Sequence, residues 1–185
     1  MPKKLDNIRE KVIAETRKIL DEQGYGAIAM RDIAKKCEIA VGTMYNYFPS
    51  KEFLVGCVVL EDWKIVYENM ISVAAGATTI HQGIRGVYDL MCGFVMTHQY
   101  LTSFDGGDSK TPYDFHERHM VLLKQIEELL CMLQKRFGYS VEDSINTFLA
   151  ESILNFSVKK YPYSQISLAF IYQAWAIPGG RGFMG

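Results

Sequence analysis

The sequence lacks the features that would assign it to several other classes of protein. It has no run of about 18 consecutive apolar residues that could form a membrane-spanning helix, and its N-terminus lacks the apolar core of a signal peptide. It also lacks a glycine-rich phosphate loop, a nucleophile elbow and the Glu-x-x-His pairs of di-iron bundles. We therefore expect a cytoplasmic protein that is not an enzyme and needs no cofactor.

Cysteine pairs and metal-ligand clusters are missing as well. The four cysteines are scattered without a Cys-x-x-Cys pair, and each falls in an apolar helical stretch, which favours buried free thiols. His116 and His119 have a spacing that could place them on one helix face, but no third ligand stands at a useful distance along the chain. No metal site is expected. The cysteines are Cys37, Cys57, Cys92 and Cys131.

Charge is distributed unevenly along the chain. The formal net charge is −1, and 49% of the 185 residues are hydrophobic, as in an ordinary globular protein. Residues 1–51 carry 10 Lys and Arg against 7 Asp and Glu, a net +3, whereas residues 52–185 carry 10 against 14, a net −4. The basic excess favours a nucleic-acid partner for the N-terminal region, although its size alone is a weak signal.

Apolar residues recur at helical spacing through the chain, and no strand pair or internal repeat is evident. Residues 55–60 taken alone would also suit a strand. We predict an all-α fold with a three-helix helix-turn-helix domain over 1–49, a larger helical domain over 50–177, and a flexible tail over 178–185. The predicted helices cover residues 5–23, 30–37, 41–47, 50–73, a stretch opening at Thr79, 111–137, 140–159 and 164–176, with a break at 74–77 and a polar loop at 103–110.

Several helix boundaries are indicated by capping residues. Gly24 and Gly138 follow the ends of predicted helices, as C-terminal capping glycines do. Ser50 precedes a helix as an N-cap, and Thr79 with Gln82 three residues later has the pattern of a capping box. Pro112 stands at the first position of the next helix, where its missing N–H is harmless.

The third predicted helix separates its side chains into two faces. At 100° per residue, Met44 and Phe48 point to one side, which suits docking on the preceding helix. The opposite arc is small and hydrogen-bonding, which suits the edges of bases in a major groove. Asn pairs with adenine, Thr donates to bases or phosphates, Tyr reaches phosphates, and Val contacts the thymine methyl. The opposite arc carries Gly42, Thr43, Asn46 and Tyr47, with Val41 and Tyr45 on its boundary.

Lys51 occupies the first turn of a predicted helix, where the helix dipole disfavours a cation by roughly 0.3–1 kcal/mol. A DNA phosphate near this helix end would compensate that cost, and it would also bind the exposed N–H groups there. The alternative is a solvated surface lysine.

These residues resemble the DNA-binding region of the TetR/AcrR family of transcriptional regulators. The resemblance covers about the first third of the chain and rests on Gly24-Tyr25, on Met30-Arg31-Asp32-Ile33-Ala34, and on the segment from Ile39 through Tyr47 to Leu54. It implies base or phosphate contacts for Arg31, Thr43, Tyr45 and Tyr47, a phosphate contact for Lys51, and close DNA approach at Gly42. Three positions depart from the family pattern: Ala29, Glu38 and Ala40 replace two caps and a turn glycine.

The resemblance also implies that residues 50–177 form a helical effector-binding and dimerisation domain, although this part of the family is too divergent to transfer roles residue by residue. Aromatic and methionine side chains recur along it. Such side chains suit a pocket for flat or apolar molecules, and the alternative is ordinary core packing. We predict a repressor released from its operator by a small, largely apolar or aromatic effector. The alternative is a helical ligand carrier or adaptor without operator binding, and a helical-bundle enzyme ranks third. The predicted pocket residues are Trp63, Tyr67, Tyr88, Met91, Phe94 and Met120.

The two C-terminal predicted helices, 141–157 and 165–176, carry broad apolar stripes. A four-helix interface between two copies would cover them, giving a homodimer whose two-fold symmetry requires a pseudo-palindromic operator. The alternative is packing within one chain. The predicted interface residues are Ile145, Phe148, Leu149, Ser152, Phe156, Leu168, Tyr172 and Trp175.

Overall fold

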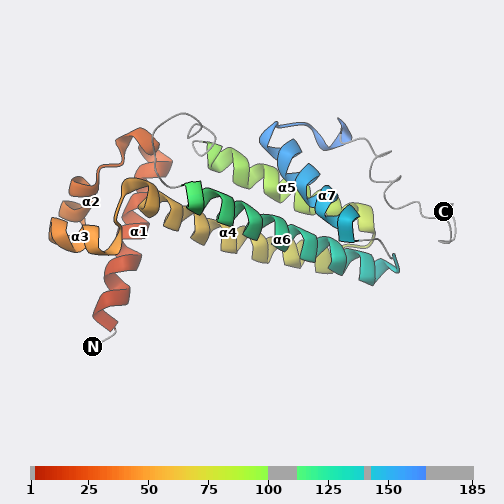
Figure 1. The fold of residues 1–185 in the computed structure, drawn as a ribbon, viewed down its shortest axis with the longest axis horizontal. Coiled ribbons are helices and arrows are strands. Elements are labelled where there is room, and N and C mark those ends of the chain that lie inside the picture. Colours follow the sequence, from red (N-terminus) through yellow and green to blue (C-terminus); the bar gives the residue numbers. More distant parts are fainter. Residues whose placement is uncertain (1–2, 100–111, 140–142, 166–185) are drawn as a thin grey trace. The chain divides into compact units, whose positions relative to one another are not determined.

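The computed structural model describes residues 3–99, 112–139 and 143–165, and this part of the chain is helical throughout without a strand (Figure 1). The all-α prediction is confirmed. The stretch 55–60, which alone would have suited a strand, lies inside a long helix. The elements are α1 (Lys3–Gln23), η1 (Tyr25–Ala27), α2 (Met30–Lys36), α3 (Val41–Tyr47), α4 (Lys51–Gly76), α5 (Ile80–Thr97), α6 (Pro112–Phe137), α7 (Asp143–Val158) and η3 (Tyr163–Gln165). The predicted loop at 103–110, the helix predicted beyond residue 165 and the predicted tail lie outside the described residues.

The chain forms two compact units, and the boundary between them along the sequence falls between Lys64 and Ile65 within α4. The first unit contains α1 to α3 and the first part of α4, and the second contains the rest of α4 with α5, α6 and α7. Leu54, Val55 and Val58 of α4 are buried in the core of the first unit. By packing, the first unit therefore extends beyond residue 49, the predicted end of the DNA-binding domain.

The first unit is held together by one apolar cluster that every helix enters. Val12 and Ile13 of α1, Ile33 of α2 and Met44 of α3 are all but fully buried. An ion-pair network joins α1 to α4 at the periphery of this cluster: the Arg17 side chain lies 2.8 Å from Asp62 and 3.3 Å from Glu61. Apolar burial is the main stabilising term here, because these partly exposed ion pairs each contribute little.

In the second unit α5, α6 and α7 pack side by side (Figure 1). The Leu133 side chain of α6 occupies the place where a Cβ of Gly83 would lie, so this glycine permits close approach of α5 and α6. A buried pair of amides, Gln134 of α6 and Asn146 of α7, exchanges hydrogen bonds in both directions. Each amide satisfies the other, so this polar pair fixes the register of the two helices without an unpaired buried group.

Four of the capping residues predicted from the sequence cap helix ends in the structure. Gly24 and Gly138 have positive φ angles of 79° and 75°, and the Ser50 Oγ accepts a hydrogen bond from Phe53 N at 3.1 Å. Thr79 Oγ1 accepts from Gln82 N at 3.1 Å, whereas the Gln82 side chain returns to Thr78 N instead of to the cap itself.

The helix break predicted at 74–77 is wrong in its position, because α4 continues to Gly76. Ala74 is fully buried, and its carbonyl near the helix end accepts a hydrogen bond from Arg136 Nη1 at 2.9 Å. Alanine has high helix propensity, and the tertiary partner satisfies one of the carbonyls that a helix end leaves unpaired. The sequence pattern alone did not show this partner.

Candidate functional site

The short helix α3 presents one face to the core of the first unit and the other to solvent. Met44 in the helix and Phe48 immediately after it expose 1% of their surface or less, as the periodicity predicted. On the outer side Gly42 and Asn46 are exposed, Val41 and Tyr45 expose 40% and 45% of their surface, and Thr43 is half-buried. Buried anchors thus hold a small, polar face outward.

The turn between α2 and α3 is built without the glycine that such turns favour. Glu38 has a φ of 58°, which is the left-handed conformation inferred from the sequence pattern. Its N–H donates to Lys35 O, and the N–H of Ile39 donates to Ala34 O, which together form a Schellman motif at the end of α2. Neither Ala29 nor Ala40 makes a side-chain cap hydrogen bond.

Lys11 of α1 supports this turn, a role that sequence analysis missed. Its Nζ donates to the Cys37 carbonyl at 3.0 Å and lies 3.8 Å from the Glu38 carboxylate. The cation therefore satisfies a carbonyl at the C-terminal end of α2, where the helix dipole favours positive charge. A lysine in the first helix gives no local signal of this contact.

Helix α2, which precedes α3 and packs against it, carries three exposed basic side chains. Arg31 is exposed and makes no ion pair among the residues that the structure describes. Lys36 is 2.9 Å from Glu15, and this hydrogen bond raises the pKa of Lys36. Arg31 and Lys35 are therefore the α2 cations without an ion pair in the described part of the chain, and of the two Arg31 offers a partner five N–H donors.

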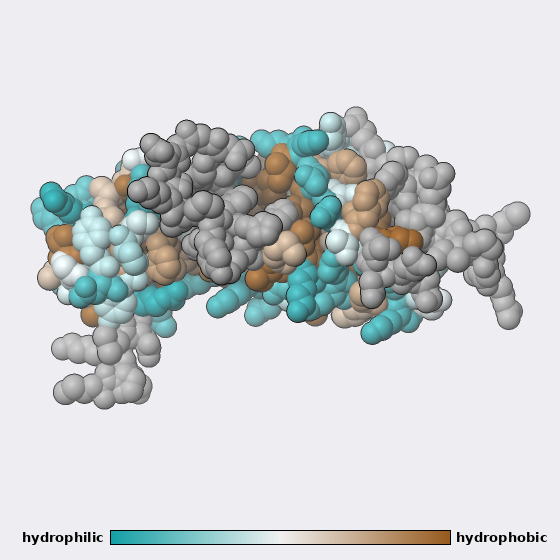
Figure 2. All heavy atoms as spheres, viewed as in Figure 1, coloured by the Kyte–Doolittle hydropathy of each residue, from teal (hydrophilic) through white to brown (hydrophobic). Residues whose placement is uncertain are grey.

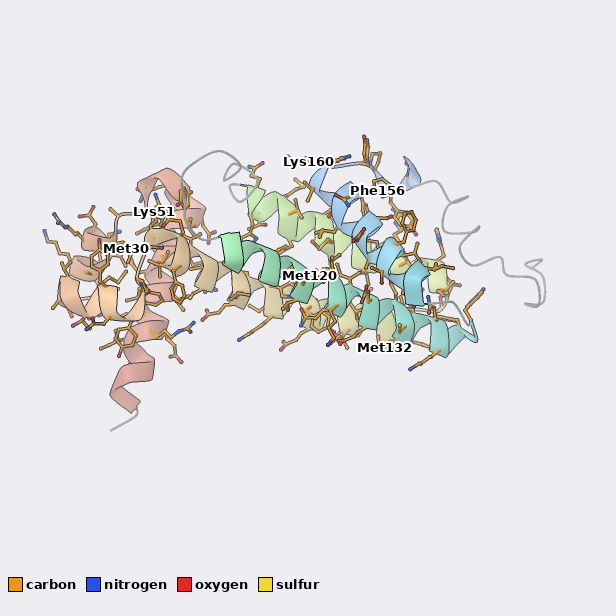
Figure 3. All side chains as sticks on the ribbon, viewed as in Figure 1. Met30, Lys51, Met120, Met132, Phe156 and Lys160 are labelled. Carbon is orange, nitrogen blue, oxygen red and sulfur yellow. The ribbon has the colours of Figure 1, made fainter. Side chains whose placement is uncertain are left out.

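Lys51 is the first residue of α4 (Figure 3). Its Nζ is 3.9 Å from the centroid of the Tyr25 ring, a cation–π contact. Burial lowers the pKa of Lys51, and the Tyr25 hydroxyl donates to Glu52 Oε1 at 3.2 Å. The sequence allowed either a phosphate contact or a solvated lysine. The structure shows a positioned, partly buried lysine, whose charge a phosphate would stabilise further.

Tyr47 departs from its expected placement. The sequence put it on the outer arc with its hydroxyl reaching phosphate, but its ring packs against the core of the first unit. Its hydroxyl is buried, with no hydrogen-bond partner among the described residues. Tyr47 lies at the edge of the outer arc, next to the buried Phe48, and the centroids of the two rings are 6.3 Å apart.

The residues predicted for an effector pocket fall into both units. Trp63 belongs to the first unit, whereas the other five belong to the second. Tyr88, Met91 and Phe94 of α5 are buried, and the Tyr88 hydroxyl donates to the Tyr161 carbonyl. Tyr67 is half-buried, with its hydroxyl donating to Glu128 at 3.3 Å, and Met120 on α6 is 52% exposed (Figure 3). The predicted set therefore mixes buried, half-buried and exposed side chains.

Helix α7 carries the described part of the predicted dimer surface. Leu149 is buried within the chain, together with Ala150 and Ile153, so this part of the apolar stripe is covered without a partner. Phe148 remains 45% exposed, and three neighbours on the same side are half-buried. These neighbours are Ile145, Ser152 and Phe156. Leu168, Tyr172 and Trp175 lie outside the described residues.

Other kinds of site find little support in the described part of the chain. No group of three or more His, Cys, Asp or Glu there is arranged to hold a metal ion, and the side chains of His116 and His119 lie outside it. Cys37 and Cys57 are buried free thiols as predicted, while Cys92 and Cys131 are half-buried. None of the described helices combines the length and hydropathy that a membrane span requires.

Two helices joined by a tight turn, with the second helix exposing a polar face, define the class of helix-turn-helix DNA-binding proteins. Residues 12–56 match the family model for bacterial regulatory proteins of the tetR family. The HTH-type transcriptional repressor KstR of Mycobacterium tuberculosis is 39% identical over 71 residues, which cover 38% of this chain and 32% of that protein. The HTH-type transcriptional regulator UidR of Escherichia coli K12 is 37% identical over 54 residues, 29% of this chain and 28% of that protein.

Solved structures extend the likeness to the whole fold. A TetR-family transcriptional regulator from Pectobacterium atrosepticum has a TM-score of 0.69 at 16% identity, covering 96% of this chain and 99% of that one. A regulator from Rhodococcus sp. RHA1 has a TM-score of 0.69 at 18% identity, covering 92% and 95%. The matches to the curated relatives span about a third of their length. Residues 12–56 thus resemble the DNA-binding region of tetR-family regulatory proteins, and the fold as a whole is similar to that of solved TetR-family regulators.

Proposed function

We propose that this chain is a homodimeric cytoplasmic repressor that binds pseudo-palindromic operator DNA through α3 and releases it when a small apolar or aromatic effector binds the second unit. The observation that carries the proposal is the outer face of α3, which is held by Met44 and Phe48 and leaves Gly42 and Asn46 uncovered. A short helix anchored in this way suits insertion into a major groove.

Two cations from the helices before and after α3 suit the DNA backbone. Arg31 is exposed, and Lys51 is positioned on the Tyr25 ring. Lys51 and the free N–H groups of the first turn of α4 would together bind a phosphate. Phosphate contacts of this kind fix orientation on the duplex, while the α3 side chains read base edges.

The second unit contains side chains that suit the binding of an apolar effector. Tyr88, Met91 and Phe94 line one side of α5, and polarizable and aromatic side chains of this kind adapt to apolar ligands. Their burial implies that an effector would replace contacts within the core of this unit. Helix α4 runs without a break from Lys51 to Gly76, so a shift of its second part would act on the position of Lys51.

Dimerisation is supported by the side of α7 on which Phe148 is 45% exposed. Figure 2 shows hydrophobic residues, in brown, beside hydrophilic residues, in teal, on the face in view. A two-fold axis would place two α3 helices about 34–36 Å apart on successive major grooves.

The proposal is tested by selecting bound sequences from random duplexes and then measuring affinity at several salt concentrations. A palindromic sequence bound with steep salt dependence is the expected result. Effectors are then sought among apolar and aromatic compounds. A true effector should weaken operator binding by about 1–3 kcal/mol, and the operator should weaken effector binding equally. Ligand binding without DNA affinity would instead establish the carrier function.

A further inference from the structure

The reading helix α3 carries no charged side chain, and this constrains the DNA that it fits. Its sequence is Val-Gly-Thr-Met-Tyr-Asn-Tyr, without lysine, arginine, aspartate or glutamate. We propose that the base pairs beneath α3 are A·T pairs, read by Asn46 and Val41, and that Arg31 of α2 reads a guanine at the edge of the half-site. This inference rests on the proposed operator binding and specifies its sequence.

Asn46 is placed to read adenine. On the helix it lies opposite the direction shared by Met44 and Phe48, both buried, so its side chain is at the centre of the outer face. The amide is exposed and makes no hydrogen bond among the described residues. An amide donates to adenine N7 and accepts from adenine N6 at the same time, a bidentate fit that no other base edge offers as well.

Val41 and Gly42 shape the N-terminal end of the reading helix. Val41 is the first residue of α3 and exposes 40% of its surface, an apolar group at the end that approaches base edges in helix-turn-helix proteins. Its methyl groups match the C5-methyl of thymine. Gly42 leaves open space where a Cβ would stand, so the base pairs can come close to this turn of the helix.

G·C pairs beneath α3 would lack matched readers. Guanine presents two acceptors, N7 and O6, which arginine or lysine reads bidentately, and cytosine presents a donor that aspartate or glutamate accepts. None of these side chains occurs on α3. Thr43 and Tyr45 discriminate weakly because hydroxyls both donate and accept. Arg31 carries the exposed guanidinium of α2, the helix that packs against α3, so the guanine is assigned to α2.

The experiment replaces single atoms of the selected operator and measures affinity by fluorescence anisotropy at one fixed salt concentration. Deoxyuridine in place of thymidine removes the methyl, 7-deaza-adenine removes adenine N7, and 7-deazaguanine removes guanine N7. Each duplex is tested with the wild type and with Val41→Ala, Asn46→Ala and Arg31→Ala. Asn69→Ala, which changes an exposed asparagine of α4, is the matched control.

Wild-type affinity should fall with each analogue, and an A·T to G·C change under Asn46 should cost roughly 5- to 150-fold, the range of one bidentate contact. Each variant should lose sensitivity only to its own analogue: Val41→Ala to deoxyuridine, Asn46→Ala to 7-deaza-adenine and Arg31→Ala to 7-deazaguanine. Asn69→Ala should behave as the wild type.

A selected half-site with G·C pairs beneath α3 would overturn the inference and leave the repressor function standing. So would an Asn46→Ala variant that keeps its full sensitivity to 7-deaza-adenine. If the folded protein selects no sequence from the random pool, the proposed function itself fails. The two failures are therefore distinguishable.

Discussion

Helices α3 and α7 belong to different units, but each buries one face in its own unit and leaves the other uncovered. The uncovered face of α3 is uncharged and partly polar, with Gly42, Asn46, Val41 and Tyr45 exposed. That of α7 is apolar, with Phe148 45% exposed and Phe156 half-buried. Both helices follow the same 3.6-residue period, so the difference lies in the chemistry of the side that the fold does not use.

This difference indicates two kinds of partner. A face that offers hydrogen-bonding groups, such as the Asn46 amide and the Tyr45 hydroxyl, suits a hydrated surface rich in donors and acceptors, such as the edges of base pairs. An apolar face of similar exposure suits a second apolar face, because burying it removes hydrocarbon from water. In the proposed homodimer a second copy of α7 would supply that face through two-fold symmetry.

The largest expected effect comes from a charge on the α7 face. Phe148→Glu should yield monomers or aggregates, because an unpaired carboxylate is costly to bury in an interface. Operator affinity should drop at least roughly 100-fold, since each half-site is then bound singly. Sedimentation at micromolar concentration and anisotropy measure both effects.

Thr147→Glu is the control for this variant, because it places a carboxylate on the other flank of α7, where it should leave the dimer intact. Phe156→Glu should resemble Phe148→Glu. A stable Phe148→Glu dimer with normal operator affinity would show that α7 does not form the interface.

A smaller effect is expected from adding a methyl group to the α3 face. Gly42→Ala should stabilise the fold by about 0.5–1 kcal/mol, because glycine is unfavourable within a helix and the Cβ would meet no atom of the chain. Operator affinity should nevertheless fall about tenfold, equal to about 1.4 kcal/mol, because the methyl keeps DNA at a distance.

Gly93→Ala in α5 is a matched control, since its Cβ also meets nothing within 4 Å. It should raise stability similarly and leave operator binding unchanged. If Gly42→Ala binds the operator as tightly as the wild type, DNA does not approach this turn of α3 closely.

Lys51→Ala should weaken binding to all duplexes alike and lower the salt slope by about one, because it removes a phosphate contact and no base contact. Lys64→Ala, an exposed lysine of the same helix, should change neither quantity. Titrations with operator and random duplexes at several salt concentrations give the slope. A loss confined to the operator would mean that Lys51 reads sequence.

The smallest expected effect is a difference in the free energy of unfolding between variants of two tyrosines of α3. Tyr47→Phe removes a buried hydroxyl without a partner among the described residues, which should stabilise the protein by about 1 kcal/mol in denaturant unfolding. Tyr45→Phe changes an exposed ring and should alter stability by less than about 0.5 kcal/mol, but it should weaken operator binding. Destabilisation by Tyr47→Phe would show that its hydroxyl has a partner.

Much of the first unit could be predicted because its signals are local. The inward placement of Met44 and Phe48 follows from helical period, and the strain at Glu38 follows from a turn that lacks glycine. The second unit was harder to predict. Aromatic and methionine residues occur both in cores and in pockets, so composition did not separate Tyr88, which is buried, from Met120, which is half exposed.

The sequence by itself determined the all-α class, the two faces of α3 and the ends of most helices, since all of these depend on residues within a few positions of one another. Only the tertiary structure decided which cation supports which group. Lys11 reaches the turn after α2, Lys51 lies on Tyr25, and Arg136 holds the end of α4. Such contacts depend on how helices distant in sequence cross, and a one-dimensional pattern carries no record of the crossing.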